Sequence, residues 1–139
     1  MKTQRTLSRI LYLVAVIELL AIPTILIPYT WMDYVHGAVG LGKLPDSPIV
    51  IYLTRSVSIL YGFHGIVTLH LSRDVERYLP LIGLFSLCAM AMGGSLLVID
   101  LILDMPLWWA ISEGAFAILF GAVVWKLRCQ ILKNPHKDH

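Results

Sequence analysis

Charged residues are scarce in this sequence. Lys, Arg, Asp and Glu make up 14% of its 139 residues, against about 25% in a typical soluble domain. The 11 Lys and Arg nearly balance the nine Asp and Glu, so the formal net charge is only +2 and offers no basic face to nucleic acid. Because 58% of the residues are hydrophobic, a soluble globular domain and a disordered segment are also excluded. The composition indicates an integral membrane protein of one compact domain.

Cysteine and the common catalytic motifs are also scarce. Cys88 and Cys129 are too far apart for a Cys-x-x-Cys redox or metal motif. The sequence has no Gly-rich phosphate loop and no His-Glu-x-x-His, and no serine has an identifiable base partner. We therefore predict no metal site, assign no catalytic residue and do not favour an enzyme.

Four apolar stretches take up most of the chain. They run over 10–27, 49–71, 79–103 and 107–127. Each is close to the ~20 residues that a helix needs to cross the hydrocarbon layer of a bilayer. The predicted fold is therefore all-α, an integral membrane four-helix bundle. We assign 1–129 to a single transmembrane domain with an outer loop at 28–48, and 130–139 to a polar cytoplasmic tail.

The distribution of cations predicts the orientation of these spans. All of the 11 Lys and Arg except Arg55 and Lys43 precede the first span, join the second to the third, or follow the fourth. The positive-inside rule then places both termini in the cytoplasm of a bacterial-type inner membrane. The links at 73–77 and 104–106 are short, so consecutive helices are expected to be antiparallel neighbours in an up-down-up-down bundle.

Two local patterns predict how the helices are shaped and packed. Pro23 has no N–H for the carbonyl of Leu19, so we expect the first span to kink there. Small residues recur at helical spacing and allow helix backbones to approach closely in a membrane. They are Ser58, Gly62 and Gly65 in the second span, Ser86, Ala89 and Gly93 in the third, and Ala110, Gly114, Ala117 and Gly121 in the fourth. We interpret them as contacts within the chain rather than as a dimer surface.

The third span has a long charge-free run over 78–99, whereas each of the other three spans has a charged residue in its interior. These interior charges, and the one near the end of the third span, are candidate site residues. An ionised group in hydrocarbon costs about 2.5–3.5 kcal/mol on the insertion scale, so each needs a partner or a function. Counted at ~1.5 Å per residue, Glu18, Arg55, Asp100 and Glu113 all lie in the outer half of their spans, and we predict that they cluster. Three interpretations stay open: a bridge from Arg55 to Glu113 or Asp100 that fixes helix register; a site for a proton, a cation or a polar ligand head; or a Glu18 that faces lipid headgroups or a partner subunit.

His64 is the only histidine deep in a span, with Tyr61 and Thr68 nearby in helical phase. We interpret it as a hydrogen-bonded packing residue, while contact with a quinone or lipid headgroup stays open. Haem is disfavoured because no second histidine lies at a similar depth on another helix, so that only Met90 or Met92 could serve as the second axial ligand. We therefore predict no cofactor, with a quinone as the open alternative. Tyr61, Thr68 and Trp31 are secondary candidates for polar contacts.

The outer loop is unusually apolar. It contains Trp31, Met32, Tyr34 and Val35. Aromatic residues of this kind concentrate at the boundary between membrane and water. We expect the loop either to lie on the membrane surface or to cover the outer end of the bundle.

The segments Tyr52-Leu53-Thr54-Arg55 and Tyr61-Gly62-Phe63-His64-Gly65, with four spans and a charged start to the first, resemble the DoxX-like small membrane proteins. The resemblance implies a four-helix membrane fold. Some members of that family are associated with quinone-linked sulfur oxidation, or with other membrane oxidoreductases as partner subunits. We carry over no residue as catalytic.

The leading hypothesis is an accessory or partner subunit of a larger, redox-linked membrane complex, because the chain is short and has no catalytic constellation. The alternative is a stand-alone binding protein or enzyme for a small amphipathic molecule such as a quinone or lipid. A proton or cation pathway ranks last, because only His64, Tyr61 and Thr68 extend a polar route inward. The expected partners are the lipid bilayer and other membrane subunits, not nucleic acid.

Overall fold

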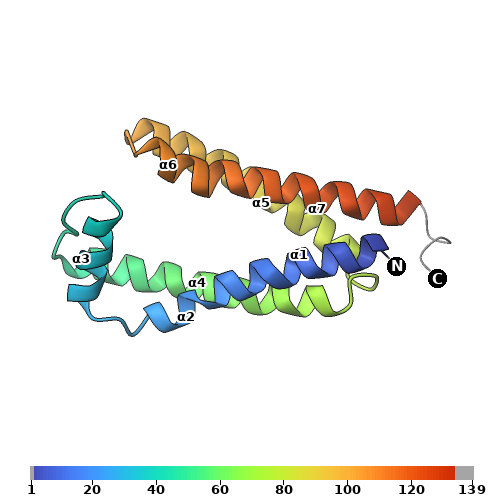
Figure 1. The fold of residues 1–139 in the computed structure, drawn as a ribbon, viewed down its shortest axis with the longest axis horizontal. Helices are drawn as coiled ribbons and strands as arrows, with labels where there is room; N and C mark the ends of the chain where they lie inside the picture. Colours follow the sequence, from blue (N-terminus) through green and yellow to red (C-terminus); the bar gives the residue numbers. More distant parts are fainter. Residues whose placement is uncertain (1, 134–139) are drawn as a thin grey trace. The chain divides into compact units, whose positions relative to one another are not determined.

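The computed structural model describes residues 2–133, and every regular element in this range is helical (Figure 1). The elements are α1 (Lys2–Leu19), α2 (Ala21–Thr24), α3 (Tyr29–Ala38), α4 (Pro48–Arg73), α5 (Leu79–Ile102), α6 (Leu107–Ala110), the π-helix η1 (Ile111–Ala115) and α7 (Phe116–Lys133). The predicted all-α class is confirmed over the described residues.

Four of the helical segments are long and apolar enough to cross a membrane. They are Lys2–Thr24, Pro48–Arg73, Leu79–Ile102 and Leu107–Lys133, of 23, 26, 24 and 27 residues. Each covers most or all of one predicted span and, with a length above the ~20 residues required, is compatible with a small four-span membrane protein. Of the predicted tail, 130–133 continue α7, and 134–139 lie outside the described residues.

The chain divides into two compact units. One is Met1–Ile10 together with Leu71–His139, and the other is Leu11–His70. Each is described by itself. The up-down-up-down order and the cytoplasmic termini stay predictions.

In the unit Leu11–His70, α1 packs closely on α4 because α4 has glycine at the contact. A Cβ on Gly65 would lie only 3.1 Å from the carbonyl oxygen of Ala15 and 3.1 Å from the Cβ of Glu18. One turn earlier, a Cβ on Gly62 would lie 2.7 Å from Cγ1 of Ile22. The prediction that these small residues mediate contacts within the chain is confirmed.

The predicted interruption at Pro23 is confirmed. Helix α1 ends at Leu19 and α2 begins at Ala21. The N–H of Leu20 is shared between the carbonyl oxygens of Val16 and Ile17, at 3.2 and 3.1 Å. The break follows directly after Glu18, so this side chain belongs to the last turn of α1.

In the other unit, α5 and α7 lie side by side as a hairpin (Figure 1). A Cβ on Gly93 would lie 2.6 Å from the carbonyl oxygen of Gly114, and a Cβ on Gly121 would lie 2.6 Å from that of Ser86. The two backbones therefore approach each other closely at these two positions of the predicted stripes of small residues.

The turn between α5 and α6 and the turn after α6 have special backbone geometry. Asp104 has a φ of 51°, in the left-handed region that non-glycine residues rarely adopt. The residues from Ile111 to Ala115 form a π-helix, whereas the sequence predicted uninterrupted α-helix over the fourth span. This wider turn includes Gly114, where a Cβ would lie 2.9 Å from the carbonyl oxygen of Gly93 in α5.

Candidate functional site

Glu18 and His64 form a hydrogen-bonded pair that joins two apolar helices. Oε1 of Glu18, in the last turn of α1, lies 2.8 Å from Nδ1 of His64 on α4. The adjoining Gly65 makes the contact possible, since it lets α1 approach to the Cβ of Glu18.

The second oxygen of Glu18 is buried without a partner. The Glu18 side chain is 12% exposed and its Oε2 is inaccessible, with no hydrogen bond to any described residue. A buried acceptor left unsatisfied costs about 1–3 kcal/mol, and more if it is charged. The His64 side chain is 42% exposed. The pair thus joins an unsatisfied acceptor to an imidazole that a molecule outside the helices can reach.

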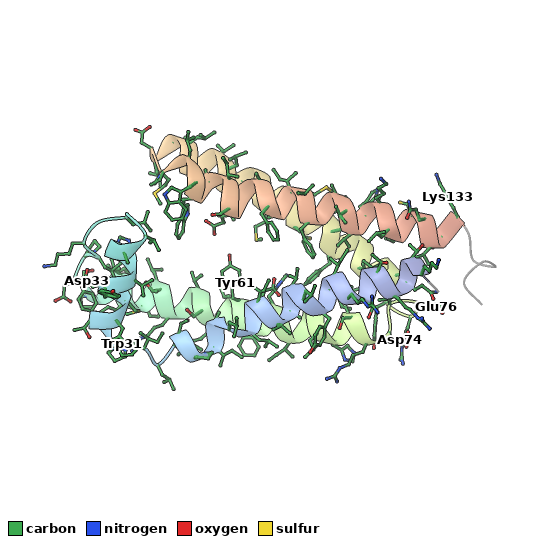
Figure 2. The ribbon with its side chains drawn as sticks, viewed as in Figure 1. Trp31, Asp33, Tyr61, Asp74, Glu76 and Lys133 are labelled. Carbon is green, nitrogen blue, oxygen red and sulfur yellow. The ribbon has the colours of Figure 1, made fainter. Side chains whose placement is uncertain are left out.

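The secondary candidates lie in different surroundings. Thr68 is fully buried, and its hydroxyl donates to the carbonyl oxygen of His64 at 2.9 Å, so it satisfies the backbone of its own helix. Tyr61 projects outward from α4 and is partly exposed (Figure 2). Trp31 belongs to α3 and is largely exposed.

Arg55 is the charged residue of α4 that the sequence placed in the predicted cluster. It is exposed and nine residues before His64 in the same helix, which corresponds to about 13 Å along the helix axis. No described carboxylate forms an ion pair with it.

The four residues that were predicted to cluster are divided between the two units. Glu18 and Arg55 belong to Leu11–His70, and Asp100 and Glu113 belong to the other unit. The cluster therefore stays a prediction.

Asp100 and Glu113 belong to the two arms of the helical hairpin. Asp100 is 6% exposed, and its Oδ2 is buried without a hydrogen bond to any residue in the described part of the chain. Its carbonyl oxygen accepts from the N–H of Met105 at 2.9 Å and so closes the end of α5. Glu113 lies in the π-helix and is partly exposed.

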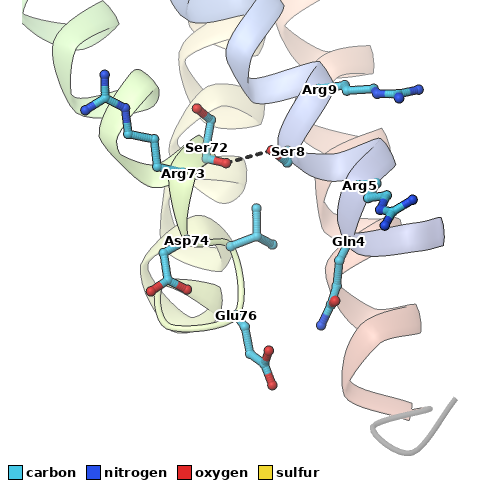
Figure 3. A pocket seen from close by; sticks show the side chains of 9 residues that line it. Gln4, Arg5, Ser8, Arg9, Ser72, Arg73, Asp74 and Glu76 are labelled. Atoms are coloured by element: carbon cyan, nitrogen blue, oxygen red, sulfur yellow. Dashed lines mark hydrogen bonds between the residues drawn. The ribbon is translucent and has the colours of Figure 1, made fainter. Parts of the chain in front are cut away.

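An open cavity of about 330 Å³ lies between the start of α1 and the link from α4 to α5 (Figure 3). It is lined by Gln4, Arg5, Ser8, Arg9, Ser72, Arg73, Asp74, Val75 and Glu76. The hydroxyl of Ser8 donates to the carbonyl oxygen of Ser72 at 2.7 Å and ties the two segments together. This cavity was not predicted from the sequence, although the arginines that flank the first and second spans were a signal for it.

Metal ligation finds no support in the described part of the chain. Between residues 2 and 133, His, Cys, Asp and Glu side chains do not gather in any group of three or more that would hold a metal ion.

Comparison of this chain with protein-family models, with curated proteins and with solved structures finds no match. The resemblance to DoxX-like proteins therefore stays a prediction that rests on the residues quoted for it.

Proposed function

We propose that this chain is a small polytopic membrane protein that binds the polar head of a small amphipathic molecule, such as a quinone, at Glu18 and His64. The proposal includes an up-down-up-down bundle in a bacterial-type inner membrane with both termini in the cytoplasm. The observation that supports it is the buried Oε2 of Glu18, which has no hydrogen-bond partner among the described residues, beside an imidazole that is 42% exposed.

The chemistry of the pair fits such a head group. The Glu18 side chain must turn for its buried Oε2 to accept from a hydroxyl of a quinol, and a hydrogen bond of this kind is stronger in a low-dielectric interior than in water. Apolar side chains next to the pair, Leu60 and Phe63 of α4, are exposed and offer a surface to a hydrocarbon tail. This arrangement has the usual composition of a small-molecule site, with few polar groups among apolar ones.

Binding of the reduced quinol decylubiquinol to the purified chain in mild detergent, followed by titration calorimetry under anaerobic conditions, tests the proposal. Glu18→Gln keeps the size of the side chain but removes its charge, and the loss of a charged hydrogen bond worth about 1.5–3 kcal/mol predicts a Kd weaker by about 10- to 150-fold. Glu76→Gln is the matched control, because this carboxylate is exposed in the link between α4 and α5, and it is expected to bind as the wild type does. Equal affinities for Glu18→Gln and the wild type would contradict the proposal.

A second candidate function, a partner subunit of a larger membrane complex, is supported by Arg55. This guanidinium is exposed within a candidate span, and no described carboxylate is paired with it. An acidic residue of another subunit would lower the cost of placing the charge in hydrocarbon.

Native mass spectrometry after gentle extraction tests this candidate. We expect additional chains to be retained with Arg55→Lys and lost with Arg55→Ala. Recovery of the chain alone, with no additional chain, in the wild type as well as in both variants would contradict it.

A further inference from the structure

One face of α3 holds the loop that follows it. Tyr29, Asp33 and His36 are spaced four and three residues apart and so share a face of the helix. The hydroxyl of Tyr29 donates to the carbonyl oxygen of Leu44, and Oδ1 of Asp33 accepts from the N–H of the same residue at 2.8 Å. Nδ1 of His36 lies 2.8 Å from the carbonyl oxygen of Gly42. The polar face of α3 is thus occupied by its own chain.

The opposite face of α3 is apolar and exposed. At about 100° per residue, Trp31, Tyr34 and Val35 lie on the side away from the polar face. Their exposed fractions are 68%, 77% and 56%. Figure 2 labels Trp31 and Asp33, one residue from each face of this helix. The helix is therefore amphipathic, with its apolar side turned outward.

The position of α3 in the chain fixes its level relative to the candidate spans. One span ends at Thr24, only five residues before α3, and the next begins at Pro48, ten residues after Ala38. Figure 1 shows α3 running across the end of α4 rather than along it. If α4 crosses a bilayer, the axis of α3 lies close to the plane of the bilayer surface, at the depth where the apolar segments end.

We propose that α3 is an interfacial helix that inserts Trp31, Tyr34 and Val35 into the headgroup region of the bilayer. Trp and Tyr favour this boundary because one end of each ring is apolar and the other polar. An amphipathic helix of this kind lies in the interface plane with its apolar face toward the acyl chains. The bonds from Tyr29, Asp33 and His36 keep the loop on the water side. The proposal is independent of any ligand at Glu18.

Spin labels on cysteine variants in vesicles of phosphatidylcholine and phosphatidylglycerol test the insertion. The background is Cys88→Ser with Cys129→Ser, which removes the two cysteines of the chain. Val35→Cys places the label on the apolar face. Lys43→Cys is the matched control, because Lys43 is exposed and lies between the two loop residues that the polar face holds. Power-saturation electron paramagnetic resonance then compares collisions with oxygen, which concentrates in lipid, and with a water-soluble nickel chelate.

We expect the ratio of oxygen to nickel collisions to be severalfold higher at position 35 than at position 43. Equal ratios, or a higher ratio at position 43, would overturn the proposal. A label at position 35 that is shielded from both reagents would also overturn it, because the face would then be covered by protein. Neither result depends on decylubiquinol binding, so this test and that of the proposed function fail separately.

Discussion

Replacing Gly93 with alanine perturbs the packing of α5 against α7 with a single methyl group. The added Cβ would lie 2.6 Å from the carbonyl oxygen of Gly114 and 2.9 Å from both the Cβ of Ala117 and the backbone nitrogen of Ile118. These distances are about 0.5–1 Å shorter than normal carbon contacts. Two of the three atoms belong to the backbone of the opposing helix, so no side chain can turn aside to make room. The two helices must separate.

The expected cost follows from this overlap. Overpacking a close contact destabilises by about 1–3 kcal/mol, whereas alanine in place of glycine stabilises a helix interior by about 0.5–1 kcal/mol. The net expectation for Gly93→Ala is a loss of up to about 2.5 kcal/mol. The assay is reversible unfolding of the purified chain in mixed micelles with rising fractions of dodecyl sulfate, followed by circular dichroism.

Gly94 provides a matched control at the next position. A Cβ there would meet nothing within 4 Å, so Gly94→Ala has the same change in helix propensity without the overlap. We expect it to leave the free energy of unfolding unchanged or to raise it by up to about 1 kcal/mol. If Gly93→Ala and Gly94→Ala have the same stability, the reasoning about the close contact between α5 and α7 is refuted.

Two further predictions concern Tyr29 and Gly83. Partial burial and then the carboxylate of Asp33 raise the pKa of Tyr29 above its usual 10.0, so in the folded chain this hydroxyl stays protonated to higher pH than in the unfolded chain. The resulting stability is complete below pH 10.0 and is lost as the pH rises through the folded-state pKa. When unfolding is measured on both sides of that pH, Tyr29→Phe should lose less stability than the wild type as the pH rises. An identical pH dependence of the two proteins would contradict the assignment. A Cβ on Gly83 would lie 2.4 Å from Nε of Arg128, whose hydrogen bond to the carbonyl oxygen of Leu79 is 2.9 Å long. Gly83→Ala should displace this flexible side chain and cost about 1 kcal/mol of stability through the lost hydrogen bond. In a double-mutant cycle, Arg128→Ala already lacks this bond, so Gly83→Ala should cause no further loss of stability in that background.

Hydropathy located the four long helices but not their ends. The first apolar stretch begins at residue 10, yet α1 begins at Lys2, and the fourth stretch ends at residue 127, yet α7 continues to Lys133. Hydropathy marks the part of a helix that is apolar enough to lie in the hydrocarbon layer, whereas the helix itself continues as long as its backbone is hydrogen-bonded. Pro23 was a sufficient signal for the break in the first span, because the missing N–H is a property of the residue itself.

The partner of Glu18 was not predicted from the sequence. Counting residues gave the depth of Glu18 in its span, and its predicted neighbours were the other charged residues at a similar depth. The rotation of α1 about its own axis, which turns Glu18 toward His64, depends on how the two helices pack. Gly65 was the available signal, since close approach at this glycine brings the neighbouring His64 to the contact. The π-helix at Glu113 and the loop held by α3 also depend on contacts that residue spacing does not encode.

Nitrogen-15 spectra of histidine-labelled protein in lipid vesicles show whether a quinol reaches His64. The His64 and His70 resonances are identified as those lost in His64→Asn and in His70→Asn, and the spectra are recorded anaerobically with and without decylubiquinol. If the head group binds at Glu18 and His64, the His64 resonances move on addition of decylubiquinol, those of His70 further along α4 do not, and Glu18→Gln abolishes the change. Unchanged His64 resonances at saturating decylubiquinol, or an equal shift of both histidines, would contradict binding at this pair.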